Sequence, residues 1–366
     1  MTTNAAVYAS LAALPASAVV RCAAGADASI DGEDDAWDAI ELRFASGVEL
    51  SIAHMTDDAQ RARHLQGFAG YVFATSGKKM NAHVHAILDR VLRTRHVLGM
   101  TAAPAFDQAS IAFVRRLCEE TKSILFLNGG VLDDCERTLL APDGAVERGA
   151  EVPRFASSLA RKARSDALLT KNGVSVQTTL PPIPGDEESI LRTPAEIARR
   201  AKCVIAVAVH GEEPDSAFAT KLVKDAGVWD DTTEEERTFL ANEKPTDHER
   251  AQFTWQYEGL AVLLWALGRV ELGPPSAICD VPALAKIIAH TSLADLASKS
   301  SPRSLEQALD AADLFYRMHW ATTDARANGR KPPPGLDPGV VVERRRAAYW
   351  LVRHRDAPWD DITLDT

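Results

Sequence analysis

The sequence lacks the features that mark several large classes of protein. It has no excess of basic residues, because 41 lysines and arginines stand against 51 aspartates and glutamates, for a formal net charge of -10. Binding to a nucleic-acid backbone needs a basic surface, so this balance argues against nucleic acid as the main partner. No run reaches the length and apolarity of a membrane-spanning helix. We therefore expect neither a nucleic-acid nor a membrane partner.

Cysteine is scarce in this sequence. The five cysteines are Cys22, Cys118, Cys135, Cys203 and Cys279. Their number is odd and no two form a Cys-x-x-Cys motif, which argues against a disulfide framework and against a zinc site of thiolates. The alanine-rich N-terminus has no positively charged segment of a signal peptide, and Pro15 interrupts it. We predict a cytoplasmic protein with reduced, mostly buried thiols.

The sequence also lacks the motifs of common active sites. It contains no Gly-x-Ser-x-Gly, no His-Glu-x-x-His, no P-loop and no complete dinucleotide fingerprint. His83 and His85 lie two residues apart in a segment predicted to be helical, where such positions do not share a face. We expect surface histidines there. The sequence therefore predicts neither a metal nor a cofactor.

The length of 366 residues favours two domains. In the first, residues 1–150, alternating apolar residues predict a β-hairpin over 40–55, after an acidic loop at 31–35. Further predicted elements are helices over 57–74, 82–94 and 107–120 and strands over 96–101, 122–127 and 137–141. This pattern indicates an α+β domain with a small sheet and helices on one face.

Residues 151–186 show no sustained periodicity, and their proline-containing stretch 180–185 is stiff and extended, so we interpret them as a linker. From 187 to 366 every predicted element is a helix. Helix starts with capping residues are predicted at 193–196, 232–235, 246–249 and 304–307, and further helices at 282–297 and after 337. The second domain is therefore predicted to be all-helical. The resulting fold class is α+β, with the helical domain at the C-terminal end.

Six charged or titratable side chains on three of these helices form a candidate polar cluster. They are Glu258, Asp313, Arg317, His319, Arg344 and Arg345. Asp313 and Arg317 lie four residues apart, close enough to pair. A guanidinium that faces a core needs a carboxylate, so we expect Arg344 to pair with Glu258, Asp310 or Asp313. The cluster either supports acid–base or anion-binding chemistry or only stabilises packing.

Several stretches of the second half resemble a bacterial family known as domain of unknown function 4272. They are LRTPAEIARRA (191–201), WQYEGLAVLLWALG (255–268), SLEQALDAADLFYRMHWA (304–321), GLDPGVVVERRRAAYWL (335–351) and WDDITLDT (359–366). FATSGKKMNAHVHAILDRVL and NGGVLDDCERTLLAPDG are similar to the region that precedes this domain in longer relatives. The resemblance covers residues 187–366 and implies a helical domain. It implies no activity, cofactor or site residue.

Two functions remain open. A protein-interaction module of adaptor or toxin-neutralising type fits the acidic charge, the two domains and the missing catalytic motifs, and we favour it. An enzyme or a binder of a small anionic ligand would instead use the polar cluster, and exposure of Asp313, Arg317 and Arg344 in one pocket would support it. An acidic tail is more often a flexible end, but Trp359 favours docking of the tail on the helical domain. The sequence does not predict an oligomeric state.

Overall fold

The computed structural model describes residues 3–365 and divides into two compact units, with the boundary between Ala156 and Ser157. The first unit combines a β-sheet with helices, and the described part of the second unit contains helices and no strand. The predicted α+β class with a helical C-terminal half is therefore confirmed.

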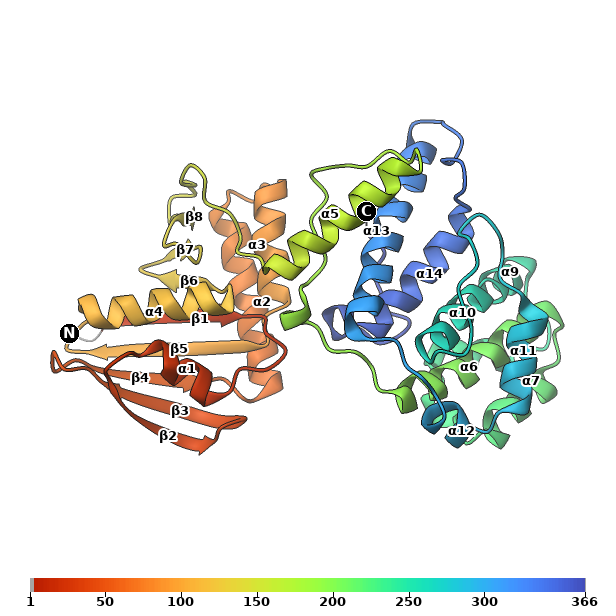
Figure 1. The fold of residues 1–366 in the computed structure, drawn as a ribbon, viewed down its shortest axis with the longest axis horizontal. Coiled ribbons are helices and arrows are strands. Elements are labelled where there is room, and N and C mark those ends of the chain that lie inside the picture. The colour runs from red at the N-terminus through yellow and green to blue at the C-terminus, as the bar shows by residue number, and fades with distance from the viewer. Residues whose placement is uncertain (1–2, 366) are drawn as a thin grey trace. The chain divides into compact units, whose positions relative to one another are not determined.

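One antiparallel sheet organises the first unit. Its described strands follow the order β2-β3-β4-β5-β1-β6-β7-β8 (Figure 1). They are β1 (Thr3–Ala9), β2 (Asp27–Glu33), β3 (Ala36–Arg43), β4 (Glu49–His54), β5 (His96–Ala103), β6 (Ile124–Leu127), β7 (Gly130–Leu132) and β8 (Thr138–Leu140). The predicted hairpin is confirmed as β3 and β4, in which Ile40 lies opposite Ile52.

The sheet is larger than predicted, because β1, β2 and β7 were not expected. Residues 31–33, predicted to lie in an acidic loop, form the end of β2. Every residue of β2 is exposed, so this edge strand shows none of the apolar alternation by which a half-buried strand is recognised. The central strand β1 is rich in alanine, which gives only a weak strand signal.

Helices cover both faces of the sheet, so the prediction of helices on one face was wrong. They are α1 (Ala16–Cys22), α2 (Asp58–Thr75), α3 (Ala82–Leu92) and α4 (Gln108–Thr121). Val7 packs with α1 and α4, whereas its neighbour Tyr8 packs with α2 and α3. Successive side chains of a strand point to opposite faces, so β1 contributes to two cores.

The second unit is a helical domain built around α10. Its helices are α5 (Ala156–Lys171), α6 (Pro194–Glu212), α7 (Ser216–Asp225), α8 (Glu234–Ala241), α9 (Asp247–Thr254), α10 (Gln256–Ala266), α11 (Val281–His290), α12 (Leu293–Ser298), α13 (Leu305–Ala327) and α14 (Pro338–Leu351), with short 3-10 turns η1 (Asp186–Glu188), η2 (Trp229–Asp231) and η3 (His354–Asp356). Every residue of α10 except Trp265 is buried, and α10 packs against α6 and α14. No helix among residues 3–365 is both long and apolar enough to cross a membrane.

The segment predicted as a linker carries a helix of the second unit. Helix α5 spans residues 156–171, and its buried positions include Ser158, Arg161, Ser165 and Leu169. Their spacing of three and four residues is helical, but three of the four are polar. A search for apolar periodicity therefore could not detect this face.

Candidate functional site

Helix α13 carries the first part of the predicted cluster. Ser304 and Gln307 close a capping box at its start. Three turns on, Asp313 and Arg317 form a bidentate pair, with 2.8 Å between Oδ2 and Nε and 3.0 Å between Oδ1 and Nη2. Both side chains are buried. A carboxylate oxygen of Asp166 on α5 lies 3.3 Å from Nη1 of Arg317, so two carboxylates hold this guanidinium.

His319 and Arg345 form the next contact of the cluster. Nη1 of Arg345 donates to Nδ1 of His319 over 2.6 Å. Arg345 also donates to the backbone carbonyl oxygens of Leu364 and Asp365, at 3.0 and 2.8 Å. Burial and the Arg345 cation lower the pKa of His319 to about 4. At neutral pH His319 is therefore an uncharged acceptor, occupied by an arginine.

Aromatic rings join these contacts. The guanidinium of Arg345 lies 4.7 Å from the ring centroids of both Tyr316 and Tyr349, and that of Arg317 lies 5.8 Å from the centroid of Tyr316. Stacking of a cation on an aromatic face is favourable when both are shielded from water. Asp313, Arg317, His319 and Arg345 thus belong to one continuous network, and Tyr316 is a further member that the predicted cluster did not include.

Glu258 and Arg344 form a separate pair between α10 and α14. Nε of Arg344 donates to Oε2 of Glu258 over 2.9 Å, and both side chains are at most 2% exposed. Nη1 of Arg344 donates to the carbonyl oxygen of Gly273, while Oε1 of Glu258 accepts from the backbone N–H of Cys279. Of the three carboxylates expected as partners of Arg344, the structure selects Glu258.

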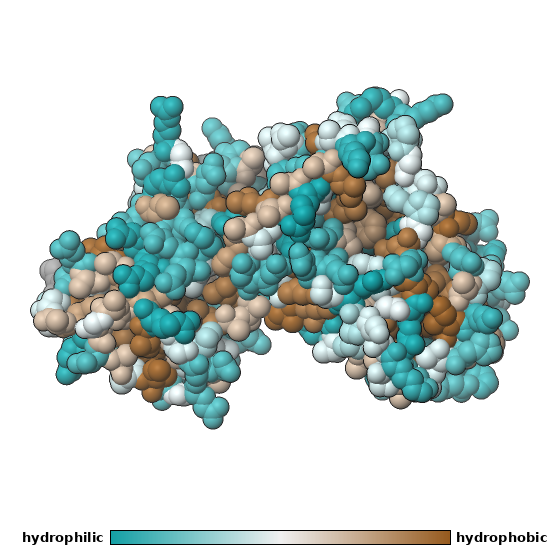
Figure 2. Space-filling model, viewed as in Figure 1, coloured by the Kyte–Doolittle hydropathy of each residue, from teal (hydrophilic) through white to brown (hydrophobic). Residues whose placement is uncertain are grey.

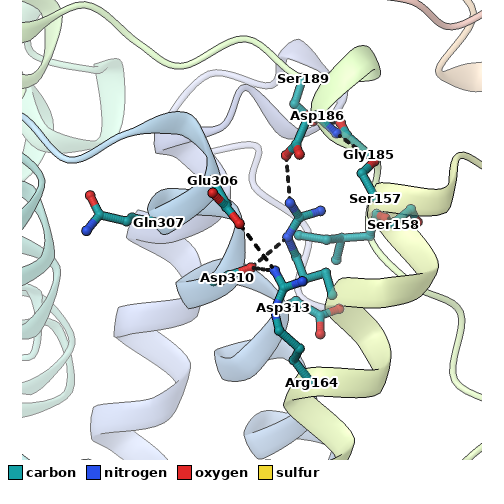
Figure 3. Close-up of polar contacts among 12 residues, drawn as sticks. Ser157, Ser158, Arg164, Gly185, Asp186, Ser189, Glu306, Gln307, Asp310 and Asp313 are labelled. Carbon is teal, nitrogen blue, oxygen red and sulfur yellow. Dashed lines mark hydrogen bonds and ion pairs between the residues drawn. The ribbon is translucent and has the colours of Figure 1, made fainter.

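A further ionic contact was not predicted. Arg161 of α5 is almost completely buried and donates to Asp310 over 3.0 Å and to Asp186 over 2.6 Å. Arg164 also donates to Asp310, over 2.7 Å, and lies 3.8 Å from Glu306 (Figure 3). These contacts join α5, η1 and the first turns of α13. They link residues about 150 positions apart, a separation that no local pattern reveals.

The C-terminal tail docks on the helical domain, as Trp359 indicated. Trp359 is 3% exposed and Ile362 is also buried. The Trp359 ring packs edge-on against Trp350 and lies 5.2 Å from the guanidinium of Arg200, which pairs with the buried Glu236. The tail is therefore part of the domain core.

A surface cavity lies beside Glu258, and we call it the α10 cavity. It has a volume of about 520 Å³ and is formed by the end of α6, by α9, by the start of α10 and by residues 278–281. Gly211 permits α6 to approach α9, because a Cβ there would lie 2.8 Å from Oγ1 of Thr254. The indole of Trp255 packs on Gly339, where a Cβ would lie 2.7 Å from the ring. Close packing thus fixes both the contact between α6 and α9 and the position of the Trp255 ring in the cavity lining.

The α10 cavity is acidic and partly apolar. Its charged lining consists of three carboxylates and one guanidinium: Glu212, Asp247, Glu258 and Arg250. Arg250 donates from Nε and Nη2 to the carbonyl oxygens of Gly211 and Glu212, so it binds the C-terminal end of α6. Two large apolar side chains in the lining are exposed, Trp255 at 37% and Ile278 at 69%.

The chain matches one family, described as domain of unknown function (DUF4272), over residues 161–362. This match covers more than half of the chain. The chain belongs to this family. The match confirms the resemblance seen in the second half and extends it N-terminally, to Arg161 within α5; it does not include the first unit. No curated protein and no solved structure matches the chain.

Within the DUF4272 domain, the predicted cluster is paired and buried. Each of its six residues is at most 9% exposed, and each has a hydrogen-bond or ionic partner. Glu258 lines the α10 cavity, but both of its oxygens are already occupied by Arg344 and Cys279. Burial and Glu258 raise the pKa of the Cys279 thiol to about 12, so this thiol is a poor nucleophile at neutral pH. The geometry gives little support to acid–base or nucleophilic chemistry at the cluster.

One group of three possible metal ligands lies close together among residues 3–365, outside the DUF4272 domain: Asp133, Asp134 and Cys135. Asp133 accepts hydrogen bonds from the backbone of Cys135 and from both the backbone and the side chain of Arg137. Asp134 pairs with Lys122 over 2.8 Å. These contacts identify the group as the anchor of the turn between β7 and β8.

Proposed function

We propose that this protein is a cytoplasmic protein-interaction module, and that its α10 cavity binds a partner segment in which a basic side chain is flanked by apolar residues. The observation that carries the proposal is the composition of the cavity, an acidic lining with exposed Trp255 and Ile278. The cysteines are free, as the reduced thiols of a cytoplasmic protein would be.

Charge supports a basic rather than an anionic occupant. Glu212 and Asp247 are exposed in the cavity lining, and Glu258 lies deeper. The single guanidinium in the lining, that of Arg250, already binds two backbone carbonyl oxygens. Glu258 is paired with Arg344, and Nη1 of Arg250 lies 3.9 Å from the fully exposed Asp247, so the lining keeps a net negative charge, carried mainly by Glu212 and Asp247. An incoming ammonium or guanidinium group meets this negative charge, and complementary charge of this kind favours specific association. A small anion would meet repulsion.

Apolar exposure supports a protein occupant. Ile278 has the largest exposed fraction among the large apolar side chains of the described residues. Trp255 is held in place against Gly339 and presents a rigid ring to which a cation can bind. Aromatic side chains at the mouth of a pocket are frequent energetic centres of protein interfaces. On the face drawn in Figure 2, apolar areas of the helical unit are separated by polar side chains.

Short synthetic peptides with lysine, norleucine or glutamate flanked by leucines test the proposal. We expect the full chain to bind the lysine peptide about tenfold more tightly than the glutamate peptide, measured by fluorescence anisotropy. Asp247→Lys should abolish this preference, and Ile278→Ser should weaken binding of the lysine and norleucine peptides alike. Glu306→Lys, an equal charge change at an exposed site outside the cavity lining, is the control. Equal affinity for lysine and glutamate peptides would refute the proposal.

A further inference from the structure

A second cavity of the helical unit runs along α6, and we call it the α6 groove. It has a volume of about 640 Å³ and is formed by α6, α7, α11 and residues 291–293 at the start of α12. Helix α6 packs against α7, α11 and α12. None of the residues that line the α6 groove belongs to the predicted cluster or to the lining of the α10 cavity. The groove is therefore a separate candidate site.

Most of the groove lining is apolar. Ile205 and Val209 of α6 line the groove, and so do Phe218 and Leu222 of α7 and Ile288 of α11. Residues four positions apart share one face of a helix, so α6 and α7 each present an apolar stripe to the groove. The Phe218 side chain is 49% exposed. Pockets for small ligands typically have volumes of about 300–1,000 Å³ and a mainly apolar lining with few polar groups, and the α6 groove fits this description.

Lys202 of α6 brings a positive charge to the groove. Its Nζ donates to the carbonyl oxygens of Ile288 and Thr291, over 2.7 Å in each case, and so binds the C-terminal end of α11. An ammonium group has three donors, so one N–H of Lys202 has no partner among residues 3–365. No carboxylate of these residues pairs with Lys202, and burial lowers its pKa. The half-buried ammonium therefore lacks a counter-ion.

The other polar groups of the lining do not supply this counter-ion. Asp225 is the one carboxylate in the lining, and it pairs with the exposed Lys221. His290 is exposed at the end of α11 and carries no negative charge. The hydroxyl oxygen of Ser292 accepts from the backbone N–H of Asp295, which leaves its O–H group able to donate. The polar part of the groove thus offers an ammonium and a hydroxyl donor, a combination suited to a carboxylate.

We propose that the α6 groove binds an amphiphilic carboxylate of the medium-chain fatty-acid class, with its carboxylate at Lys202 and its alkyl chain along Val209 and Phe218. The carboxylate supplies the counter-ion that Lys202 lacks, so the charges of ligand and groove are complementary. The alkyl chain covers apolar surface that is otherwise in contact with water. Lys202 and Val209 lie about 10 Å apart along the axis of α6, a length that suits a chain of medium length. This site and the α10 cavity are independent of each other.

Three variants separate the charge of the groove from its apolar wall. Lys202→Met removes the ammonium but keeps an unbranched side chain, and Lys202→Arg keeps a cation that can still donate to the end of α11. Phe218→Ser removes an exposed apolar side chain and leaves Lys202 in place. Lys286→Met is the matched control, since Lys286 is exposed on α11 and lies outside the groove lining.

Calorimetric titration of the full chain with octanoate and with octanol, which has the same chain length but no charge, tests the proposal. We expect one octanoate per chain, bound at least about tenfold more tightly than octanol. Lys202→Met should abolish this preference, whereas Lys202→Arg and Lys286→Met should retain it. Phe218→Ser should weaken the binding of both ligands by at least about threefold, because it removes apolar contact area.

A purely structural role of Lys202 gives a different result. If Lys202 only held the end of α11, the natural chain would not distinguish octanoate from octanol or from octylamine, and this comparison decides the question even where Lys202→Met does not fold. Absence of saturable octanoate binding at about 1 mM, equal affinity for octanoate and octanol, or an unchanged preference in folded Lys202→Met would overturn the proposal.

Discussion

Acidification should destabilise the helical unit through His319, and replacing His319 by asparagine should remove that part of the pH dependence. Nδ1 of His319 accepts a hydrogen bond from the Arg345 guanidinium, and the imidazole is largely shielded from water. A proton on Nδ1 would remove this acceptor and place two cations in contact. Protonation of His319 is therefore opposed in the folded state and unopposed in the unfolded chain.

The sign and size of the effect follow from the two pKa values. The pKa of His319 falls from 6.5 in the unfolded chain to about 4 in the folded protein. The stabilisation is therefore complete above pH 6.5 and is lost as the pH falls towards 4, because the unfolded chain then binds the extra proton. At about 1.4 kcal/mol for each unit of difference, the loss reaches about 3 kcal/mol.

Denaturant unfolding of the natural chain and of His319→Asn, at neutral pH and near pH 4.5, measures this loss. Asparagine keeps an oxygen that can accept a hydrogen bond from Arg345 but does not titrate. On acidification the free energy of unfolding of His319→Asn should therefore fall by about 2–3 kcal/mol less than that of the natural chain. His248→Asn, at an exposed position of α9, is the control and should follow the natural chain. Parallel pH profiles of the natural chain and His319→Asn would refute the reasoning.

Four further variants test the packing of the helical unit. Arg344→Ala or Glu258→Ala should each cost about 3–5 kcal/mol in denaturant unfolding, because one buried charge loses its partner, and unchanged stability would contradict the pairing. Deletion of residues 359–366 removes the buried Trp359 and should cost about 3 kcal/mol, whereas an unaltered unfolding temperature would exclude a structural role of the tail. Gly211→Ala should lower stability by about 1–3 kcal/mol, as its Cβ would clash with α9, and a neutral effect in calorimetry would show that the two helices can separate.

The sequence predicted those elements whose signal lies within a few neighbouring residues. The capping boxes at Thr193, Thr246 and Ser304 mark the starts of α6, α9 and α13, because the required residues lie within one turn of each other. The strand β2 and the helix α5 were missed for opposite reasons. Every residue of the strand is exposed, whereas the helix buries two serines and an arginine but only one apolar residue, Leu169.

Within the candidate site, local contacts could likewise be predicted from the sequence, and contacts between distant residues mostly could not. Asp313 and Arg317 are four residues apart, so their pairing was predictable from helix geometry. Glu258 and Arg344 were linked only through the need of buried charges for partners, since 86 positions separate them. Nothing in the sequence brings Ile278 to the mouth of a cavity with Trp255. Such a surface depends on how helices cross, which no local pattern records.

The docked tail has a consequence for the order in which the protein can fold during synthesis. The Trp359 ring packs against Gly259 of α10 and near Arg200 of α6, elements that emerge from the ribosome long before it. The strands of the first unit are all available once residue 140 has emerged, and domains generally fold as units during translation. The core of the helical unit is instead completed only when residues 359–362 have emerged and Trp359 covers Gly259 of α10. Until then this part of α10 is exposed, and transiently exposed apolar surface is prone to aggregation.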